Sequence, residues 1–271
     1  MVSYSCSMDM LQIISTFLEM QRAVLFDETV ELNHGVLCTV SSNQTPYDNF
    51  MLLKNNLTPE VIVKYEQEFA RRNRYPSFLI INSSDYELSI HLLEQLGYCE
   101  YTNDQWMFID AAKSPLLTMF PTAKTSIRYA TDLSALEDFL FVFKSSHQED
   151  DLKNAYGAGD AFVPTIEATW KKEVSKDRCI YMVVYDDSEP AACAVAVVYR
   201  SMAYLTCVGT HPSYRRRGYA SLLIGEFLRI SIEKKSTTIF LTTEKNRYPF
   251  DYFSKHGFVD RFSTIGYTKK I

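Results

Sequence analysis

Two stretches of this 271-residue chain follow one pattern, in which a predicted helix is followed by a glycine, an aromatic residue and a predicted strand. They are 93–98 (LEQLGY) and 253–258 (FSKHGF), and their glycines lie 160 residues apart. The strand after each stretch carries aromatic side chains, Trp106 in the first and Tyr267 in the second. Similar segments at a long separation are typical of an internal duplication. We therefore expect two copies of one α/β fold in tandem.

The second half alternates between the two hydrophobic periodicities. Short β-branched and aromatic runs predict strands, and apolar residues at helical spacing predict helices. The expected strands are 126–130, 179–185, 190–199, 202–208, 239–243 and 258–268, and the expected helices are 133–146, 164–174, 217–234 and 246–256. This order of elements predicts a mixed α/β (α+β) sheet with helices packed against it.

Charge and glycine divide the chain near residue 120. Residues 1–120 hold 7 Lys and Arg against 15 Asp and Glu, whereas residues 121–271 hold 21 against 18, so the net charges are −8 and +3. Seven of the nine glycines lie in the second part. Glycine lets the backbone approach an anion, so we expect a phosphate-binding turn only there. The stretch 111–125 has two prolines and is the expected linker between domains 1–115 and 125–271.

Composition argues against several classes of function. A net charge of −5 and a pI of about 5.6 argue against a general nucleic-acid binder. No apolar run reaches the about 20 residues that span a bilayer, and no basic segment precedes an apolar one at the start. We therefore expect a soluble, cytoplasmic protein with no nucleic-acid or membrane partner. The scattered cysteines and histidines lack metal-ligand spacing, which predicts buried thiols and no metal site.

The segment 208–221 (VGTHPSYRRRGYAS) carries the clearest chemical signal. It predicts the end of a strand, a turn, and a helix that opens at Gly218. Amide groups at the start of a helix, helped by the helix dipole, bind phosphate and pyrophosphate. Arg215, Arg216 and Arg217 add positive charge. The segment is neither a P-loop nor G-x-G-x-x-G, and an arginine-rich helix start on its own is more often structural.

The pattern R-x-x-G-x-A at 215–220 resembles the (Gln/Arg)-x-x-Gly-x-(Gly/Ala) signature of the GCN5-related N-acetyltransferases (GNAT). The preceding 210–215 is similar to that family's strand end and turn, and Asn246 and 253–258 are similar to its later blocks. The resemblance covers 126–271 and implies the acyl-CoA N-acyltransferase fold, a mostly antiparallel sheet flanked by helices. The first half shares only its closing helix–glycine–tyrosine–strand pattern. The whole resembles a tandem GNAT protein whose first copy is degenerate and lacks the cofactor signature.

The resemblance implies acetyl-coenzyme A as the cofactor and a role for each matched position. The backbone of Val208, Gly209 and Thr210 would pair with the pantetheine arm, and an amide there would polarise the thioester carbonyl. Asn246 and Phe253 would lie beside the cofactor. The residues expected around the pyrophosphate are Arg215, Arg216, Arg217, Gly218, Tyr219, Ala220 and Ser221.

The expected catalytic positions are where the sequence departs from the family. The tyrosine that often protonates the leaving thiolate aligns with Phe253, which has no proton to donate. Tyr252 is adjacent, but one residue along a helix turns a side chain by about 100°. Tyr204 occupies the place of an occasional strand glutamate, as a proton relay or as ordinary packing. Glu244, after the next strand, is a candidate base or a solvated carboxylate.

The implied function is acetyl-coenzyme A-dependent N-acetylation of a primary amine of a small molecule or protein. Tyr156 and Asp160 lie where this family often places its acceptor loop, and the acidic first half favours a cationic acceptor or a protein partner. The alternative, which Phe253 keeps open, is a catalytically weak or inactive coenzyme A-binding or interaction module. A different acyl-coenzyme A as donor is a further alternative.

Overall fold

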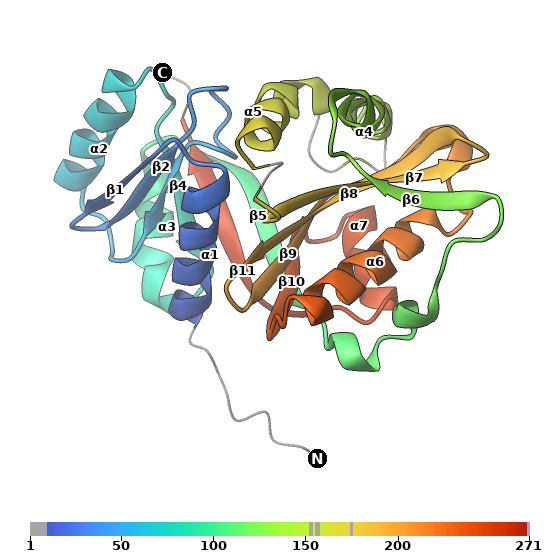
Figure 1. Cartoon of the computed structure of the whole chain (residues 1–271). Coiled ribbons are helices and arrows are strands. Elements are labelled where there is room, and N and C mark those ends of the chain that lie inside the picture. Colours follow the sequence, from blue (N-terminus) through green and yellow to red (C-terminus); the bar gives the residue numbers. More distant parts are fainter. Residues whose placement is uncertain (1–9, 152–153, 155–157, 174–175, 270–271) are drawn as a thin grey trace, which may run out of the picture.

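The computed structural model describes residues 10–151, 154, 158–173 and 176–269 (Figure 1). The first half forms strands β1 (Glu28–Leu32), β2 (Gly35–Thr39), β3 (Phe50–Leu53), β4 (Ser77–Ile81) and β5 (Cys99–Phe108), and helices α1 (Met10–Val24), α2 (Pro59–Arg71) and α3 (Glu87–Gln95).

The second half forms strands β6 (Thr125–Tyr129), β7 (Cys179–Asp186), β8 (Glu189–Tyr199), β9 (Met202–Thr210), β10 (Thr238–Glu244) and β11 (Val259–Thr268), and helices α4 (Leu133–Ser146), α5 (Val163–Glu173), α6 (Tyr219–Glu233) and α7 (Tyr248–Lys255). Each of these elements was expected from its periodicity, within two residues at either end.

The strands form one sheet in the order β1-β2-β3-β4-β11-β5-β10-β9-β8-β7-β6. The pairs β3–β4 and β9–β10 are parallel, and the other pairs are antiparallel. Helices lie on both faces of the sheet (Figure 1). The predicted mixed, mostly antiparallel sheet flanked by helices is therefore confirmed.

The two halves exchange their last strands. Strand β5, which closes the first half, lies between β10 and β11, and β11, which closes the second half, lies between β4 and β5. The register sets Thr242 of β10 opposite Trp106 of β5, and Thr264 of β11 opposite Ile81 of β4. Each closing strand thus completes the sheet of the other half. The boundaries 1–115 and 125–271 stay a prediction, and the sheet itself is shared across them.

Alternation along the strands separates two apolar layers. Helices α1, α4 and α5 pack over one face of the sheet, in a cluster that includes Trp106, Tyr204 and Phe240. Helix α6 packs over the opposite face with Ala203 and Leu205, and Phe253 of α7 belongs to the same cluster. Because successive side chains of β9 enter different layers, this strand is buried on both sides. We refer to these as the α1 face and the α6 face.

The connection between the halves packs against α6. It contains the short turns η2 (Ala111–Lys113) and η3 (Pro115–Thr118). Leu116 is buried, and its carbonyl oxygen lies 2.5 Å from where a Cβ on Gly225 of α6 would stand. Arg229 of α6 donates hydrogen bonds to the carbonyls of Leu117 and Met119. The expected linker is therefore held in place by a close helix contact that requires glycine.

The described cysteines are free thiols: three are buried, Cys207 is partly exposed, and Cys99 is exposed at the start of β5. The expectation of buried thiols is thus wrong for Cys99. Among the described residues, no group of three or more His, Cys, Asp or Glu side chains could hold a metal ion. No helix in that part of the chain is long and apolar enough to cross a bilayer.

Candidate active site

A cavity of about 610 Å³ crosses the sheet at the point where β9 and β10 separate. The ladder between these parallel strands ends at Leu205 and Leu241, although both strands continue beyond that pair. Residues 206–210 and 242–243 then line the cavity from its two sides. Leu205 and Leu241 belong to the α6 face and Tyr204 to the α1 face. The cavity therefore joins the two faces of the sheet.

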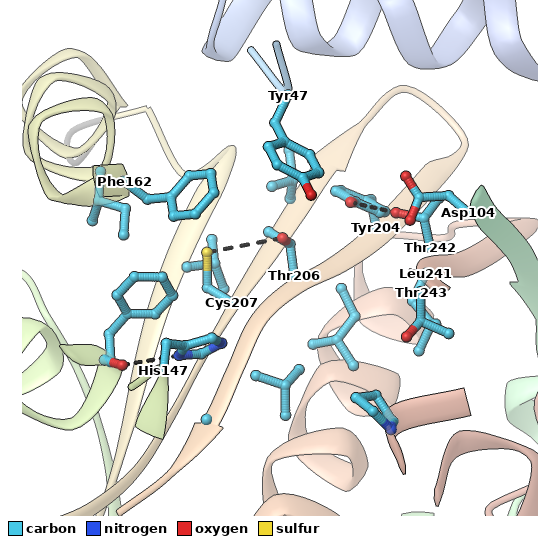
Figure 2. A pocket seen from close by; sticks show the side chains of 18 of the residues that line it. Tyr47, Asp104, His147, Phe162, Tyr204, Thr206, Cys207, Leu241, Thr242 and Thr243 are labelled. Atoms are coloured by element: carbon cyan, nitrogen blue, oxygen red, sulfur yellow. Dashed lines mark hydrogen bonds between the residues drawn. The ribbon is translucent and has the colours of Figure 1, made fainter. Parts of the chain in front are cut away.

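A bulge bends β9 beside this opening. In the pairing with β8, Cys207 and Val208 together oppose the single residue Ala194, and Cys207 has a left-handed φ of 53°. The Thr206 hydroxyl donates to the Cys207 Sγ over 3.8 Å (Figure 2). Burial raises the pKa of Cys207 to about 11. The bulge changes the direction of the strand edge, as bulges commonly do. The Cys207 thiol, with so high a pKa, is protonated at neutral pH and is a poor nucleophile.

The start of α6 closes the cavity at the α6 face. Gly218 is the N-cap of the helix with a φ of 85°, and no atom of the described residues, apart from its chain neighbours, lies within 4 Å of a Cβ built on it. Arg216 is also left-handed, with a φ of 63°, and lines the cavity together with 218–221. The first amides of a helix have no partner within the helix. Helix-start amides on a cavity wall, flanked by arginine, suit a phosphate group.

The three arginines of this segment have different surroundings. Arg215 lines the cavity and is ion-paired with Asp151. Arg216 lines the cavity and is exposed. Arg217 instead pairs with Asp186 over 2.9 Å and is absent from the cavity wall. The predicted cofactor residues that line the cavity are Val208, Gly209, Thr210, Arg215, Arg216, Gly218, Tyr219, Ala220, Ser221 and Phe253.

Tyr252 and Phe253 of α7 both line the cavity, so the turn of about 100° between them does not remove Tyr252 from the site. The Ser221 Oγ lies 2.9 Å from the Tyr252 hydroxyl and 2.9 Å from the His256 Nε2. The His256 Nδ1 is 2.7 Å from the Tyr252 carbonyl, which can only accept a hydrogen bond. A neutral His256 therefore accepts at Nε2 from Ser221, which in turn accepts from Tyr252. Burial raises the pKa of Tyr252.

Tyr204 and Glu244, the two other predicted catalytic residues, differ in position. Tyr204 lines the cavity on the α1 face, and its hydroxyl lies 3.0 Å from the Thr242 Oγ1 (Figure 2). Burial raises the pKa of Tyr204 to about 12. Glu244 is not part of the cavity wall, and it accepts a hydrogen bond from the Arg247 Nε over 3.2 Å. Burial also raises the pKa of Glu244.

Three more predicted site residues lie apart from the cavity wall or outside the described chain. Asn246 is exposed in a left-handed conformation after β10 and does not line the cavity. Asp160 is exposed in the short turn η4 (Gly159–Phe162) and does not line it either, although Phe162 does. Tyr156 lies outside the described residues.

Asp104, which the sequence analysis missed, brings a carboxyl group from the first half into the cavity. The exchange of strands sets it opposite Glu244, and Figure 2 shows it beside Thr242. Its Oδ1 is inaccessible to solvent and has no hydrogen-bond partner within the described chain. Burial raises the pKa of Asp104 to about 7. The Thr102 hydroxyl lowers this pKa, and the charge of Glu244 raises it further. Such a carboxyl group is suited to accept a proton near neutral pH.

Two further ionisable residues of the cavity wall were also missed. Asp48 is buried, and its Oδ2 accepts from the Asn43 Nδ2 over 2.5 Å. Burial raises the pKa of Asp48. His147 follows α4, with its Nδ1 2.9 Å from the Phe143 carbonyl, and burial lowers its pKa. The carbonyl only accepts, so the neutral ring holds its proton on Nδ1. No local motif marks these positions, which the fold alone brings together.

Comparisons with known proteins agree with this geometry. Residues 143–258 match the model of the acetyltransferase (GNAT) family. A GCN5-related N-acetyltransferase from Kribbella flavida has a similar fold, with a TM-score of 0.68 and 14% identity over 96% of this chain and 95% of that one. A conserved protein of unknown function from Staphylococcus epidermidis gives a TM-score of 0.70 and 13% identity over 90% of this chain and 94% of that one.

A tandem GNAT protein from the clavulanic acid biosynthesis pathway is also similar, with a TM-score of 0.57 and 11% identity over 93% of this chain and 86% of that one. No curated protein matches the sequence significantly. The family match covers β9, the start of α6 and α7, which form the α6-face end of the cavity. Residues 143–258 thus match the acetyltransferase (GNAT) family, and the chain as a whole shares the fold of these GNAT proteins.

Proposed function

We propose that the protein is an acetyl-coenzyme A-dependent N-acetyltransferase that acts on a primary amine. One observation carries the proposal: the cavity passes through the sheet where β9 and β10 separate, so two ligands can meet from opposite faces. Acetyl-coenzyme A would supply the activated acetyl group from the α6 face. The amine would approach from the α1 face, where Asp104 lies.

The residues of the α6 face fit the proposed cofactor. Residues 218–221 line the cavity at the start of α6, where the first amides of the helix can hold a pyrophosphate, with Arg216 beside them. The edge of β9 at 208–210 faces the gap and can pair with the amide groups of a pantetheine arm. An N–H group on the same edge would donate to the acyl carbonyl oxygen, where negative charge develops during attack. Phe253 would contribute apolar contact.

Asp104 is the proposed general base. A primary amine is mostly protonated at neutral pH and must lose a proton before it can attack. The Asp104 carboxylate would take that proton first. The neutral nitrogen would then form its bond to the acyl carbon, the carbon–sulfur bond would break, and the nitrogen would lose its second proton to water as the amide forms. Glu244, which the sequence offered as a candidate base or a solvated carboxylate, would act through its charge on Asp104. Tyr204 would fix the neighbouring Thr242 through their hydrogen bond.

Tyr252 is the proposed general acid in place of the residue at 253. Its hydroxyl would give a proton to the leaving thiolate. When His256 is protonated, its Nε2 donates to Ser221, which can then donate to Tyr252 and restore the hydroxyl proton. A thiol has a pKa of about 8.5, so a thiolate is a fair leaving group without assistance. We therefore expect the acid to increase the rate without being essential.

The proposal is tested by incubating the full chain with acetyl-coenzyme A and a set of primary amines. Mass spectrometry should find an amine heavier by one acetyl group, formed in step with free coenzyme A. Hydrolysis of acetyl-coenzyme A without an acetylated amine would contradict the proposal.

A coenzyme A-binding module without catalysis is the second candidate, favoured by Phe253, which lines the cavity but has no hydroxyl group. Binding of acetyl-coenzyme A with no acetyl transfer to any amine would support this candidate over the first.

A further inference from the structure

The α1-face part of the cavity is walled mainly by apolar side chains. They include Phe17 and Val24 of α1, Ile166 of α5, Val197 of β8 and Trp106 of β5. We call this part the acceptor chamber. A short amine that reached Asp104 would leave these walls uncovered. Pockets of this kind gain affinity mostly from apolar contact, and their few polar groups fix orientation.

Aromatic rings at the chamber are only partly covered by the protein. Phe17, Tyr47 and Phe162 are each partly exposed, although they line the cavity. Figure 2 shows Tyr47 and Phe162 directed into it, and their rings pack edge to face with centroids 5.9 Å apart. The Tyr47 hydroxyl donates to the Tyr101 carbonyl over 3.1 Å, which fixes its ring. Rings held in this way offer apolar area that a ligand can cover at little entropic cost.

Charge is divided between the two ends of the cavity. The basic side chains of its wall, Arg215 and Arg216, lie at the start of α6, and the acidic ones, Asp48 and Asp104, lie in the acceptor chamber. No lysine or arginine of the described residues lines the chamber itself. Carboxylates and aromatic faces both attract an ammonium group. An anionic acceptor would meet like charge there.

We propose that the acceptor is a primary amine carried on an apolar body, with its nitrogen at Asp104 and its apolar part along the acceptor chamber. The inference rests on the proposed amine acetylation and narrows its substrate. Polyamines and amino sugars fit this chamber less well, because their further polar groups would give up water beside apolar walls such as Phe17, Ile166 and Val197.

A series of linear amines from ethylamine to octylamine tests the inference. Each added methylene that enters the chamber should raise kcat/KM about fourfold, which corresponds to about 0.8 kcal/mol of apolar burial. Hexamethylenediamine is the matched polar substrate, since it has the length of hexylamine with a second charged end. It should react at least tenfold more slowly than hexylamine. A faster diamine would mean that Asp48 binds a second cation, and would overturn the inference.

Two matched variants test whether the dependence of kcat/KM on amine length arises in the acceptor chamber. Phe162→Ser removes an aromatic wall of the chamber and should lower the ratio of octylamine to ethylamine kcat/KM at least tenfold. Phe141→Ser is the control, because Phe141 lies on α4 and is 49% exposed outside the cavity wall. It should keep the wild-type ratio. Equal ratios in both variants would overturn the placement of the apolar body.

Binding without turnover separates this inference from the proposed function. Calorimetry with the same amines, in the absence of acetyl-coenzyme A, should give a Kd that tightens with chain length. If no amine is acetylated but the Kd still tightens with chain length, the result supports the apolar chamber and contradicts the proposed acetyl transfer. If amines are acetylated at rates that do not depend on their length, the result supports acetyl transfer and contradicts the apolar chamber. If no amine is acetylated and the Kd does not depend on length, both proposals are contradicted.

Discussion

Replacing Asp104 by asparagine should stabilise the protein increasingly as the pH rises. Burial raises the pKa of Asp104 from an ordinary 3.8 to about 7. The folded-state pKa lies above the unfolded-state value. The protonated carboxyl group of wild-type Asp104 therefore contributes stability that is fully present below about pH 4 and is lost as the pH rises to about 7. A difference of about three pKa units corresponds to at most about 4 kcal/mol. Asparagine has a similar shape and no charge, so it avoids that loss.

Urea unfolding followed by tryptophan fluorescence measures this effect. Between about pH 5 and about pH 8 the stability of Asp104→Asn relative to wild type should increase by nearly 3 kcal/mol. Asp260→Asn is the matched control, since Asp260 is exposed on the neighbouring strand β11. That variant should stay within about 0.5 kcal/mol of wild type at both pH values. An Asp104→Asn difference that does not grow with pH would refute the argument that Asp104 is buried and protonated.

The same variant tests the proposed chemistry. As a general base Asp104 must be ionised, so wild-type kcat/KM should rise with pH through about 7. Asp104→Asn should lose about 10²- to 10⁴-fold in kcat/KM, the usual contribution of a general base. A variant that is stabilised but fully active would mean that the group is buried for another reason and that the base lies elsewhere.

Other parts of the structure give predictions of their own. Gly225→Ala places a Cβ 2.5 Å from the Leu116 carbonyl oxygen and should destabilise the fold by about 1–3 kcal/mol, read as a lower urea midpoint. Glu173 is fully buried and accepts two hydrogen bonds of 2.7 Å from Arg178. Glu173→Gln should therefore lower the free energy of unfolding by about 3 kcal/mol, and a loss below about 0.5 kcal/mol would contradict this prediction. Tyr252→Phe should lower kcat at most about 100-fold and leave the Kd of acetyl-coenzyme A unchanged in calorimetry. A weakened Kd would assign Tyr252 to binding.

The local elements could be predicted because each carries its own signal. The strands of the second half are apolar and β-branched, and the helix after Gly218 repeats its apolar residues at helical spacing. The start of this helix at Gly218 was predicted too, and glycine allows the positive φ found there at no steric cost. These signals lie within about 15 residues of chain, which is why composition and periodicity are enough.

The exchange of β5 and β11 could not be predicted in this way. Both strands follow the same helix–glycine–aromatic pattern, so either could pair with β4 or with β10. Their partners are decided by packing across the whole sheet, for example by the stacking of Trp106 on Phe240 and Phe262. Asp104 was missed for the same reason. Its place in the cavity depends on a pairing with β10 that joins residues about 140 positions apart.

Tyr252 illustrates a different limit. Helical rotation alone sets Tyr252 about 100° from Phe253, and it excludes Tyr252 only if a site contacts one face of a helix. In the structure both residues line the cavity, and Ser221, itself hydrogen-bonded to His256, holds the Tyr252 hydroxyl. The shape of a cavity is a property of several elements together, and a single helix does not encode it.

The most direct test of the account is calorimetric titration of acetyl-coenzyme A into the wild type, Gly218→Asp and Gly97→Asp. Gly218 and Gly97 have φ values of 85° and 80°, and no described residue beyond their chain neighbours has an atom within 4 Å of either Cβ position, so the two substitutions strain the backbone alike. Only Gly218→Asp puts a negative charge at the start of α6. The account predicts binding by wild type and by Gly97→Asp, weakened at least tenfold, or about 1.4 kcal/mol, in Gly218→Asp. Equal binding by both variants, or none by the folded wild type, would contradict the account.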